Sequence, residues 1–218
     1  MSKVFIVGGS GHVGRHLAKQ LVTRGHKAWS MHRDPAQAET LKSIGATPVL
    51  GDLVKLDVQA LANLMADCDA VVFSAGAGGK GGKEMTNAID GKGLELAVAA
   101  AQQANIKRFL LISAFPEAAR GKDVSETFEN YMAVKKQADV HLSATDLNWV
   151  IVRPGLLLDD AGTQQVHTGL AIPYGEVPRE DVAAILLEII ERPAVNRVII
   201  ELTQGKLPVA EAVAKFAK

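Results

Sequence analysis

Tyr131 and Lys135 are the residues of this sequence whose types and spacing most directly suggest chemistry. They lie four positions apart in a segment with helical character, so both side chains can project from one helix face into the same cleft. A nearby ammonium group favours the phenolate form of a tyrosine and lowers its pKa from about 10. We therefore expect Tyr131 to donate or accept a proton near neutral pH. Taken alone, the spacing also fits a packed tyrosine beside a solvated lysine.

A glycine-rich turn near the amino terminus suggests where a cofactor would bind. The apolar run Val4–Val7 leads into Gly8, Gly11 and Gly14, and an amphipathic helical pattern follows. Gly8 permits a tight turn, Gly11 lets the backbone approach phosphates, and Gly14 lets the helix pack closely on the strand. Free N–H groups at the start of the helix suit a diphosphate, which His12 could also contact from within the turn. The alternative is a loop that only reverses the chain.

Arg33 predicts the choice of cofactor. NAD-specific sites usually place an acidic residue at the end of the second strand, where it binds the ribose hydroxyls and repels a 2′-phosphate. Here that strand exits through His32 and Arg33, and Asp34 precedes Pro35, which is the pattern of a helix N-cap followed by proline. Asp34 would turn towards its own helix and leave Arg33 to pair with a 2′-phosphate. We expect NADP, with NAD as the other option; a solvated loop arginine is the alternative role for Arg33.

Short β-rich runs alternate with helix-length segments and must position these residues. The alternation is typical of right-handed βαβ units and of a parallel sheet covered on both faces. The sequence therefore predicts an α/β fold, a doubly wound parallel sheet, in one domain over residues 1–218. We expect substrate-side elements mainly in 155–178 and in a small C-terminal extension, 201–218. Strands are expected at Val4–Val7, Lys27–Met31, Thr47–Leu50, Ala70–Phe73, Arg108–Ile112, Trp149–Val152 and Arg197–Ile200. Helices are expected at His12–Arg24, Pro35–Ile44, Val58–Met65, Met85–Ala104, Glu126–Ala144, Arg179–Glu191 and Leu207–Ala217.

Small and polar residues follow several of the predicted strands. Examples are Gly51-Asp52-Leu53, Ser74-Ala75-Gly76, Ser113-Ala114-Phe115 and Arg153-Pro154-Gly155. Since ligands bind such sheets beyond the carboxyl ends of the strands, these residues are consistent with a nucleotide lying across the sheet edge. The glycine-rich run 76–83 lacks the Ser or Thr of a Walker phosphate loop and is expected to be a flexible cofactor-side loop.

Composition argues against several classes of function. The chain has 24 Lys and Arg residues and 24 Asp and Glu residues, so it lacks the basic surface expected of a nucleic-acid-binding protein. It has no apolar run long enough for a membrane span and no signal-peptide pattern. Cys68 is its only cysteine and its six histidines show no metal-ligand spacing, so we expect no metal. The chain is expected to be cytoplasmic, a monomer or homodimer, with a small-molecule substrate as its partner.

Several ordered motifs together resemble one family. They are Val7–Gly14, Gly51–Leu53, Phe73–Gly76, Lys107–Ser113, the Tyr131-x-x-x-Lys135 pair and Val150–Gly155. In these motifs the chain resembles the short-chain dehydrogenase/reductase superfamily, in its atypical NAD(P)H-binding branch with NmrA-like and biliverdin reductase B-like proteins. The resemblance implies a Rossmann fold and an NAD(P)-dependent oxidoreductase that acts on a small carbonyl or alcohol.

The resemblance also implies roles for individual residues. Tyr131 would be the general acid/base, Lys135 would hold the nicotinamide ribose and lower the tyrosine pKa, and Ser113 would hydrogen-bond the substrate oxygen. The implied cofactor contacts are Gly8, Ser10, Gly11, His12, Val13, Gly14, Arg33, Asp52, Leu53, Ser74, Ala75, Gly76, Lys135 and Pro154.

The sequence departs from the family pattern at one catalytic position. We find no clear counterpart of the catalytic asparagine of classical members, since Asn87 and Asn105 are poor candidates and Asn105 is better placed to end a helix. Two other functions therefore stay open: a regulatory module that senses NADP(H) with little turnover, and a sugar-nucleotide epimerase-like enzyme.

Overall fold

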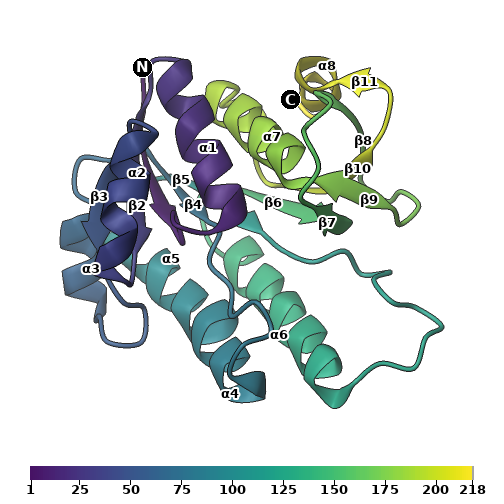
Figure 1. Cartoon of the computed structure of the whole chain (residues 1–218), viewed down its shortest axis with the longest axis horizontal. Coiled ribbons are helices and arrows are strands. Elements are labelled where there is room, and N and C mark those ends of the chain that lie inside the picture. Colours follow the sequence, from purple (N-terminus) through teal and green to yellow (C-terminus); the bar gives the residue numbers. More distant parts are fainter. Residues whose placement is uncertain (218) are drawn as a thin grey trace.

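A nine-stranded sheet forms the centre of the molecule (Figure 1). The computed structural model describes residues 1–217; Lys218, the last residue of the predicted segment 201–218, lies outside the described residues. The strand order is β11-β8-β10-β6-β5-β4-β1-β2-β3, and neighbouring strands are parallel except in the pairs β8–β10 and β8–β11. The strands of this sheet are β1 (Lys3–Val7), β2 (Lys27–His32), β3 (Thr47–Leu50), β4 (Ala70–Phe73), β5 (Arg108–Ile112), β6 (Asn148–Pro154), β8 (Gln165–Gly169), β10 (Val198–Gln204) and β11 (Leu207–Pro208). Each of the two edge strands contains a proline, Pro48 in β3 and Pro208 in β11.

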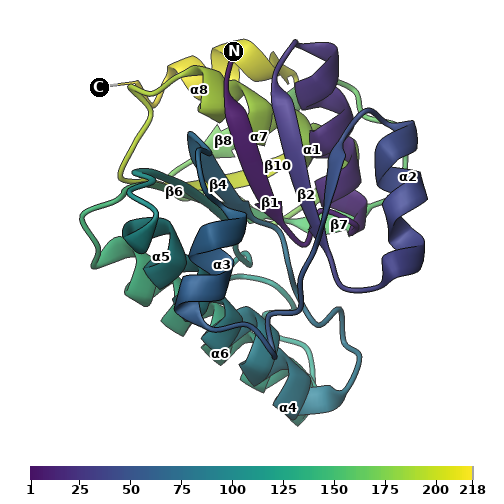
Figure 2. The same ribbon diagram turned by 90° about the vertical axis from the view of Figure 1, so that its left-hand side faces the viewer.

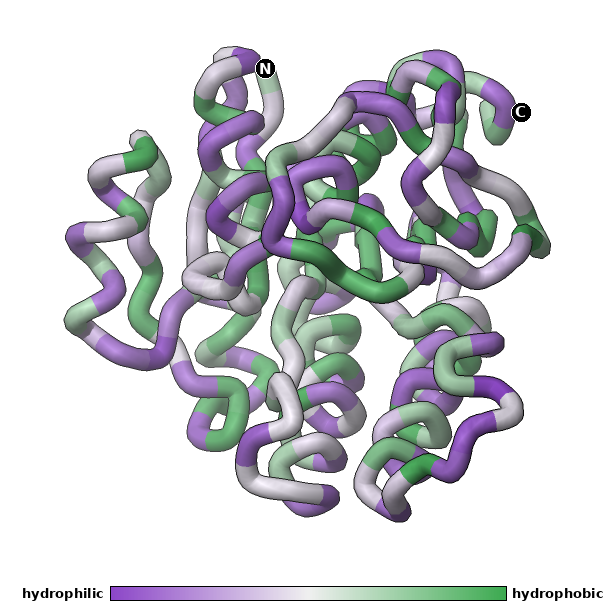
Figure 3. Tube along the Cα trace, turned by 45° about the vertical axis from the view of Figure 1, so that its right-hand side comes forward, coloured by the Kyte–Doolittle hydropathy of each residue, from purple (hydrophilic) through white to green (hydrophobic). Residues whose placement is uncertain are grey.

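Helices cover both faces of the sheet, as the two perpendicular views show (Figure 1, Figure 2). One face carries α1 (His12–Thr23), α2 (Ala38–Ser43), α7 (Arg179–Glu191) and α8 (Val209–Ala214). The other carries α3 (Val58–Leu64), α5 (Gly93–Gln103) and α6 (Glu126–Ser143). Shorter elements are the 3₁₀ turn Pro35–Gln37, α4 (Gly82–Thr86), the π-helical turn Asn87–Lys92, and a separate parallel pair, β7 (Leu156–Leu158) with β9 (Glu176–Pro178). The trace coloured by hydropathy alternates between hydrophilic and hydrophobic residues along the outer helices, because each buries only one side (Figure 3).

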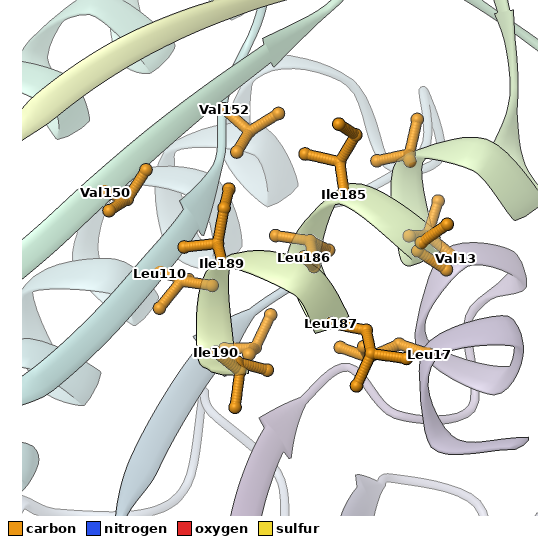
Figure 4. Packing of buried hydrophobic residues seen from close by; sticks show 14 of the residues in the cluster. Val13, Leu17, Leu110, Val150, Val152, Ile185, Leu186, Leu187, Ile189 and Ile190 are labelled. Atoms are coloured by element: carbon orange, nitrogen blue, oxygen red, sulfur yellow. The ribbon is translucent and has the colours of Figure 1, made fainter. Parts of the chain in front are cut away.

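Helix α7 forms the centre of the core on its face of the sheet. Ten of its 13 residues are buried, as expected for a helix that is apolar almost all round. Ile185, Leu186 and Ile189 lie against side chains of β5 and β6, and Leu187 packs beside Leu17 of α1 (Figure 4). Full burial of such a side chain contributes about 1.5–3 kcal/mol. This packing fixes the first residues of α7 at the edge of the sheet.

The chain reverses its direction of winding between β1 and β4. From these two neighbouring strands, β2 and β3 extend to one side and β5 and β6 to the other. A crevice opens at such a point beyond the carboxyl ends of the strands. The turn after β1 and the loop after β4 therefore meet at one place.

The predicted α/β fold, with a doubly wound parallel sheet, is confirmed, and all seven predicted strands are present. Three regions differ from the prediction. The first two residues of the helix expected at Leu207–Ala217 form strand β11, and helix α8 covers Val209–Ala214. The helix expected at Met85–Ala104 begins at Gly82 and contains the π-helical turn, where Gly91 brings the backbone close to α6; an added Cβ would lie 3.3 Å from Val134 Cγ1. The segment 155–178, whose elements were not predicted, contains β7, β8 and β9.

Candidate functional site

Three hollows at the carboxyl edge of the sheet contain most of the predicted site residues. We name each after one lining residue. The Arg33 hollow, of about 490 Å³, is lined by residues including Gly8, Ser10, Arg33, Asp52, Leu53 and Lys80. The Lys135 hollow, of about 610 Å³, is lined by residues including His12, Val13, Ser74, Asp90, Ser113, Tyr131 and Lys135. The Phe115 hollow, of about 250 Å³, is lined by residues including Phe115, Met132, Pro154, Leu156, Tyr174 and Arg179.

The hollows adjoin one another in a fixed order. Ala75 and Gly76 line both the Arg33 and the Lys135 hollow. Ser113 and Tyr131 line both the Lys135 and the Phe115 hollow. Ser113 and Tyr131 therefore lie at the boundary between the Lys135 hollow and the smaller Phe115 hollow.

The glycine turn brings the backbone close to itself and to β4. Gly8 has a φ of 81°, and a Cβ added there would lie 2.6 Å from Ala75 Cα. A Cβ at Gly14 would lie 2.6 Å from the carbonyl oxygen of Gly8, so only glycine allows α1 to start this close to the turn. Gly11 is the N-cap of α1, with no side-chain cap and no acidic residue in the first turn. The amides at this helix start are suited to an anion.

Asp34 has the capping role that the sequence predicts. Its carboxylate accepts a hydrogen bond from Ala36 N at 3.0 Å, and Gln37 Oε1 accepts one from Asp34 N at 3.4 Å. Asp34 therefore turns towards its own short helix, and Arg33 is exposed at the Arg33 hollow. Lys80 lines the same hollow and was not predicted; the run of glycines around it was the available signal.

Lys135 is buried and held by two oxygen atoms. Its Nζ donates a hydrogen bond to Ile112 O at 2.8 Å and lies 3.7 Å from Asp90 Oδ1. The other oxygen of Asp90 accepts from Ala77 N at 3.0 Å, which ties this carboxylate to the loop after β4. Burial lowers the pKa of Lys135, and Asp90 and Asp139 act against this effect. Asp90 belongs to the π-helical turn and is buried.

The prediction that Lys135 lowers the pKa of Tyr131 is wrong for this structure. The pKa of Tyr131 is raised to about 12, first because the side chain is largely desolvated and then because Asp90 and Asp139 disfavour a phenolate. The ammonium of Lys135 is engaged by Asp90 and Ile112, so its charge is offset close to its source. A helix pattern shows which residues share a face with Tyr131, but it does not reveal the carboxylate of Asp90, which comes from another helix.

Asp139 continues the row of functional groups along α6. It lies four residues after Lys135. Its carboxylate accepts a hydrogen bond from Arg153 Nε at 3.0 Å and forms an ion pair with Arg153 Nη2 at 2.9 Å. Its second oxygen and Ser113 Oγ are both buried without a hydrogen-bond partner among residues 1–217. Burial raises the pKa of Asp139, and the neighbouring Ser113 hydroxyl and Arg153 act in the opposite direction. The Ser113 hydroxyl is thus near a carboxylate but outside hydrogen-bond geometry, and its oxygen is buried.

The predicted site residues fall into four groups in space. Gly8, Ser10, Arg33, Asp52 and Leu53 line the Arg33 hollow. Ser113, Tyr131 and Lys135 come together at the Lys135 hollow, where His12, Val13 and Ser74 also lie. Gly11 and Gly14 shape the turn without lining a hollow, and Pro154 lines the Phe115 hollow instead of the two that the other predicted cofactor contacts line. Sequence reasoning assigned no role to Lys80, Asp139 or Arg179.

Neither a metal cluster nor a membrane span is found in the part of the chain that the structure describes. No group of three or more His, Cys, Asp and Glu side chains there could hold a metal ion. No helix there is both long and apolar enough to cross a membrane.

Comparison with known proteins gives one family. The family model described as "NAD(P)H-binding" matches residues 8–193. A Bacillus subtilis protein called "Uncharacterized sugar epimerase YhfK" is 33% identical over 215 residues, which cover 98% of this chain and 100% of that protein.

Solved structures share the fold. A "Putative NAD-dependent epimerase/dehydratase from Bacillus halodurans" superposes with a TM-score of 0.90 at 28% identity, covering 99% of this chain and 100% of that one. A short-chain dehydrogenase/reductase from Veillonella parvula, solved in complex with NADP, has a TM-score of 0.70 at 20% identity and covers 94% and 95% of the two chains.

Proposed function

This chain belongs to the NAD(P)H-binding family, and on that premise we propose that it is an NADP-preferring oxidoreductase that transfers a hydride to or from a small carbonyl or alcohol. The position of Tyr131 and Ser113 carries the proposal. Both residues line the Lys135 hollow and the Phe115 hollow, where the two meet. A substrate in the smaller hollow would place its oxygen beside both of them and its carbon towards the larger one.

The described residues fit a dinucleotide. The turn at Gly8 and Gly14 has no room for a Cβ, and the uncapped start of α1 can hold the diphosphate through backbone amides. Arg33 and Lys80 are two cations at the far hollow, where a 2′-phosphate would be paired. Lys135, held by Ile112 O and Asp90, would donate a remaining N–H to the nicotinamide ribose.

Tyr131 and Ser113 would perform the proton chemistry. When bound, the cofactor supplies or accepts a hydride. In the direction of reduction the carbonyl carbon gains the hydride with its two electrons, and the carbonyl oxygen gains the proton of Tyr131 Oη. Ser113 Oγ would donate a hydrogen bond to the same oxygen as negative charge develops on it. Solvent then returns a proton to Tyr131. In the direction of oxidation these transfers are reversed.

Replacing Tyr131 with Phe tests the proposal. The variant keeps the ring and its packing but removes the proton that is transferred. General acid–base catalysis contributes roughly 10²–10⁴-fold, so kcat for NADPH-dependent carbonyl reduction should fall by about that factor. The affinity for NADPH, measured by fluorescence titration, should stay nearly constant. An unaltered kcat for a good substrate would refute the role of Tyr131.

The same assay separates the other candidate functions. A protein that only senses NADP(H) would bind NADPH but reduce no member of a panel of aldehydes, ketones and quinones. An epimerase would interconvert UDP-glucose and UDP-galactose without net consumption of cofactor. Either result would replace the oxidoreductase proposal.

A further inference from the structure

We propose that the substrate is a small apolar carbonyl compound that carries an acidic group, bound by Arg179 in the Phe115 hollow. This inference deepens the proposed function and rests on it. The sequence motifs assign no role to Arg179. The family match does not say whether the substrate is an organic acid or a sugar nucleotide, and the inference favours an organic acid.

Most of the residues that line the Phe115 hollow are apolar, and the polar ones are Ser113, Tyr131, Tyr174 and Arg179. Phe115 and Tyr174 form an edge-to-face pair with ring centroids 5.3 Å apart, and Met132 and Leu156 add aliphatic surface. Leu156 and Tyr174 keep 51% and 42% of their surface exposed, which is high for large apolar side chains. A hydrocarbon or aromatic body would bury this surface when it binds.

Arg179 is the one charged residue among those lining this hollow. It is the first residue of α7 and also lines the Lys135 hollow, so its side chain reaches the boundary beside Tyr131. Its Nη1 donates to Leu157 O at 3.2 Å and to Asp159 Oδ1 at 2.8 Å. Within residues 1–217, no hydrogen bond engages its Nε or Nη2. A guanidinium with donors to spare is suited to a carboxylate or phosphate.

The acidic residues near Arg179 leave its charge available. Glu180 and Asp181 accept hydrogen bonds from the backbone amides of 162–164, at 2.9 to 3.0 Å. Asp159 is the carboxylate that pairs with Arg179, and its side chain is 71% exposed. Because solvent screens such a pair and its net energy is small, an anion of the substrate can compete with Asp159.

The size and chemistry of the hollow disfavour a sugar nucleotide. Its volume of about 250 Å³ lies below the range of roughly 300–1,000 Å³ typical of pockets for drug-sized ligands. A sugar carries many hydroxyl groups, and the few polar side chains that line this hollow could not replace all of their hydrogen bonds to water. A small acid needs only one cation and one proton donor, and Arg179 and Tyr131 supply them.

Matched probes that differ only in charge test the inference. The wild type is assayed with NADPH and either 4-carboxybenzaldehyde or methyl 4-formylbenzoate. We expect kcat/KM to be at least tenfold higher for the acid, mainly through KM. Arg179→Met keeps the length and apolar stem of the side chain but removes its charge, and should bring the acid-to-ester ratio close to one. Arg179→Lys keeps the charge but loses the paired N–H donors of the guanidinium, so it should retain part of the preference for the acid over the ester.

Two controls make the result specific. Arg197→Met removes a partly exposed arginine that pairs with Asp146 and should leave the acid-to-ester ratio unchanged. NADPH titration of Arg179→Met reports folding and cofactor binding. If the variant loses affinity for NADPH as strongly as activity with the acid, Arg179 serves the cofactor and the inference fails. A ratio near one in the wild type also overturns it.

A binding measurement separates this inference from the proposed function. Titration of the NADP⁺-loaded protein with 4-carboxybenzaldehyde needs no turnover. If the acid binds more tightly than the ester, in a way that depends on Arg179, but neither is reduced, the oxidoreductase proposal fails and the ligand class stands. If the probes are reduced but bind without preference, the ligand class is wrong.

Discussion

At the scale of single residues, burial of Tyr131 favours one direction of the proposed reaction. With its pKa raised to about 12, the hydroxyl is protonated at neutral pH and ready to donate. The phenolate that alcohol oxidation requires would be present at roughly one part in 10⁵ at pH 7, from the five-unit difference between pH and pKa. The residue is therefore better suited to carbonyl reduction.

This difference predicts opposite pH dependences. The protonated form of Tyr131 persists below its pKa, so kcat/KM for reduction should show no tyrosine-dependent loss between about pH 7 and pH 10. Oxidation of the corresponding alcohol should accelerate about tenfold per pH unit over the same range, as the phenolate population rises. Rate profiles in both directions check this. A Tyr131-dependent pKa near 7 in the reduction profile would contradict it.

Arg33 should determine the choice between the two cofactors. Hydrogen bonds to charged groups contribute about 1.5–3 kcal/mol, so Arg33→Ala should weaken NADPH binding ten- to a hundredfold and change NADH binding little. Lys80→Ala removes the other cation that lines the Arg33 hollow, so it should also weaken NADPH binding and change NADH binding little. Arg24→Ala, which removes an arginine paired with Glu191 on the surface, is the control. Equal losses for NADPH and NADH after Arg33→Ala would refute this assignment.

At the scale of elements, two glycines of one turn should respond differently to the same substitution. Gly11 has an extended backbone, and an added Cβ would meet only Gly8 O at 3.2 Å, whereas at Gly14 it would lie 2.6 Å from that oxygen and 2.9 Å from Gly9 Cα. Gly11→Val should therefore fold but lose NADPH affinity, because the side chain blocks the diphosphate. Gly14→Val should lower the melting temperature, because α1 must move off the turn. Thermal unfolding and NADPH titration of both variants test this, and retained affinity in Gly11→Val would place the nucleotide elsewhere.

Local signals in the sequence predicted local structure, and packing between elements explains what was missed. Asp34 and Pro35 are adjacent, so the cap could be predicted from the two residues alone. Asn105, expected to end a helix, follows α5 with a φ of 57°. By contrast, the position of Asp90 depends on a π-helical turn that packs against α6, and no local pattern encodes that contact. The partners of Tyr131 and Lys135 could therefore not be derived from the motif that contains them.

At the scale of the whole molecule, buried strands were predictable and the substrate side was not. The parallel strands near the centre are runs of apolar residues buried on both faces, such as the fully buried β4, and these runs stand out in a sequence. Strand β8 has alternating burial over five residues and pairs with β10, more than 30 residues later. Such short elements are specified by partners that are distant in sequence.

Cys68 provides a measure of how cofactor binding stabilises the entire fold. The thiol is buried, and burial raises its pKa to about 11, so the native protein should react with an aromatic disulfide reagent far more slowly than the unfolded chain. Since NADPH binds the native state, a concentration of 100 times Kd should stabilise it by about 2.7 kcal/mol and slow the labelling further if unfolding exposes Cys68. Labelling that is equally fast in native and unfolded protein would show that Cys68 is accessible in the folded state.

The prolines at the two borders of the sheet bear on how copies of this molecule can associate. Pro48 lies in β3 and Pro208 in β11, the outermost strands, and proline has no N–H to offer an incoming strand. A strand of a second copy that paired with either edge strand would lack one backbone N–H donor at the proline. Strand β11 is also only two residues long. Natural proteins use the same features to prevent aggregation between sheet borders. We therefore expect the protein to resist fibre-like growth at high concentration, and any pair of copies to meet through helices or loops.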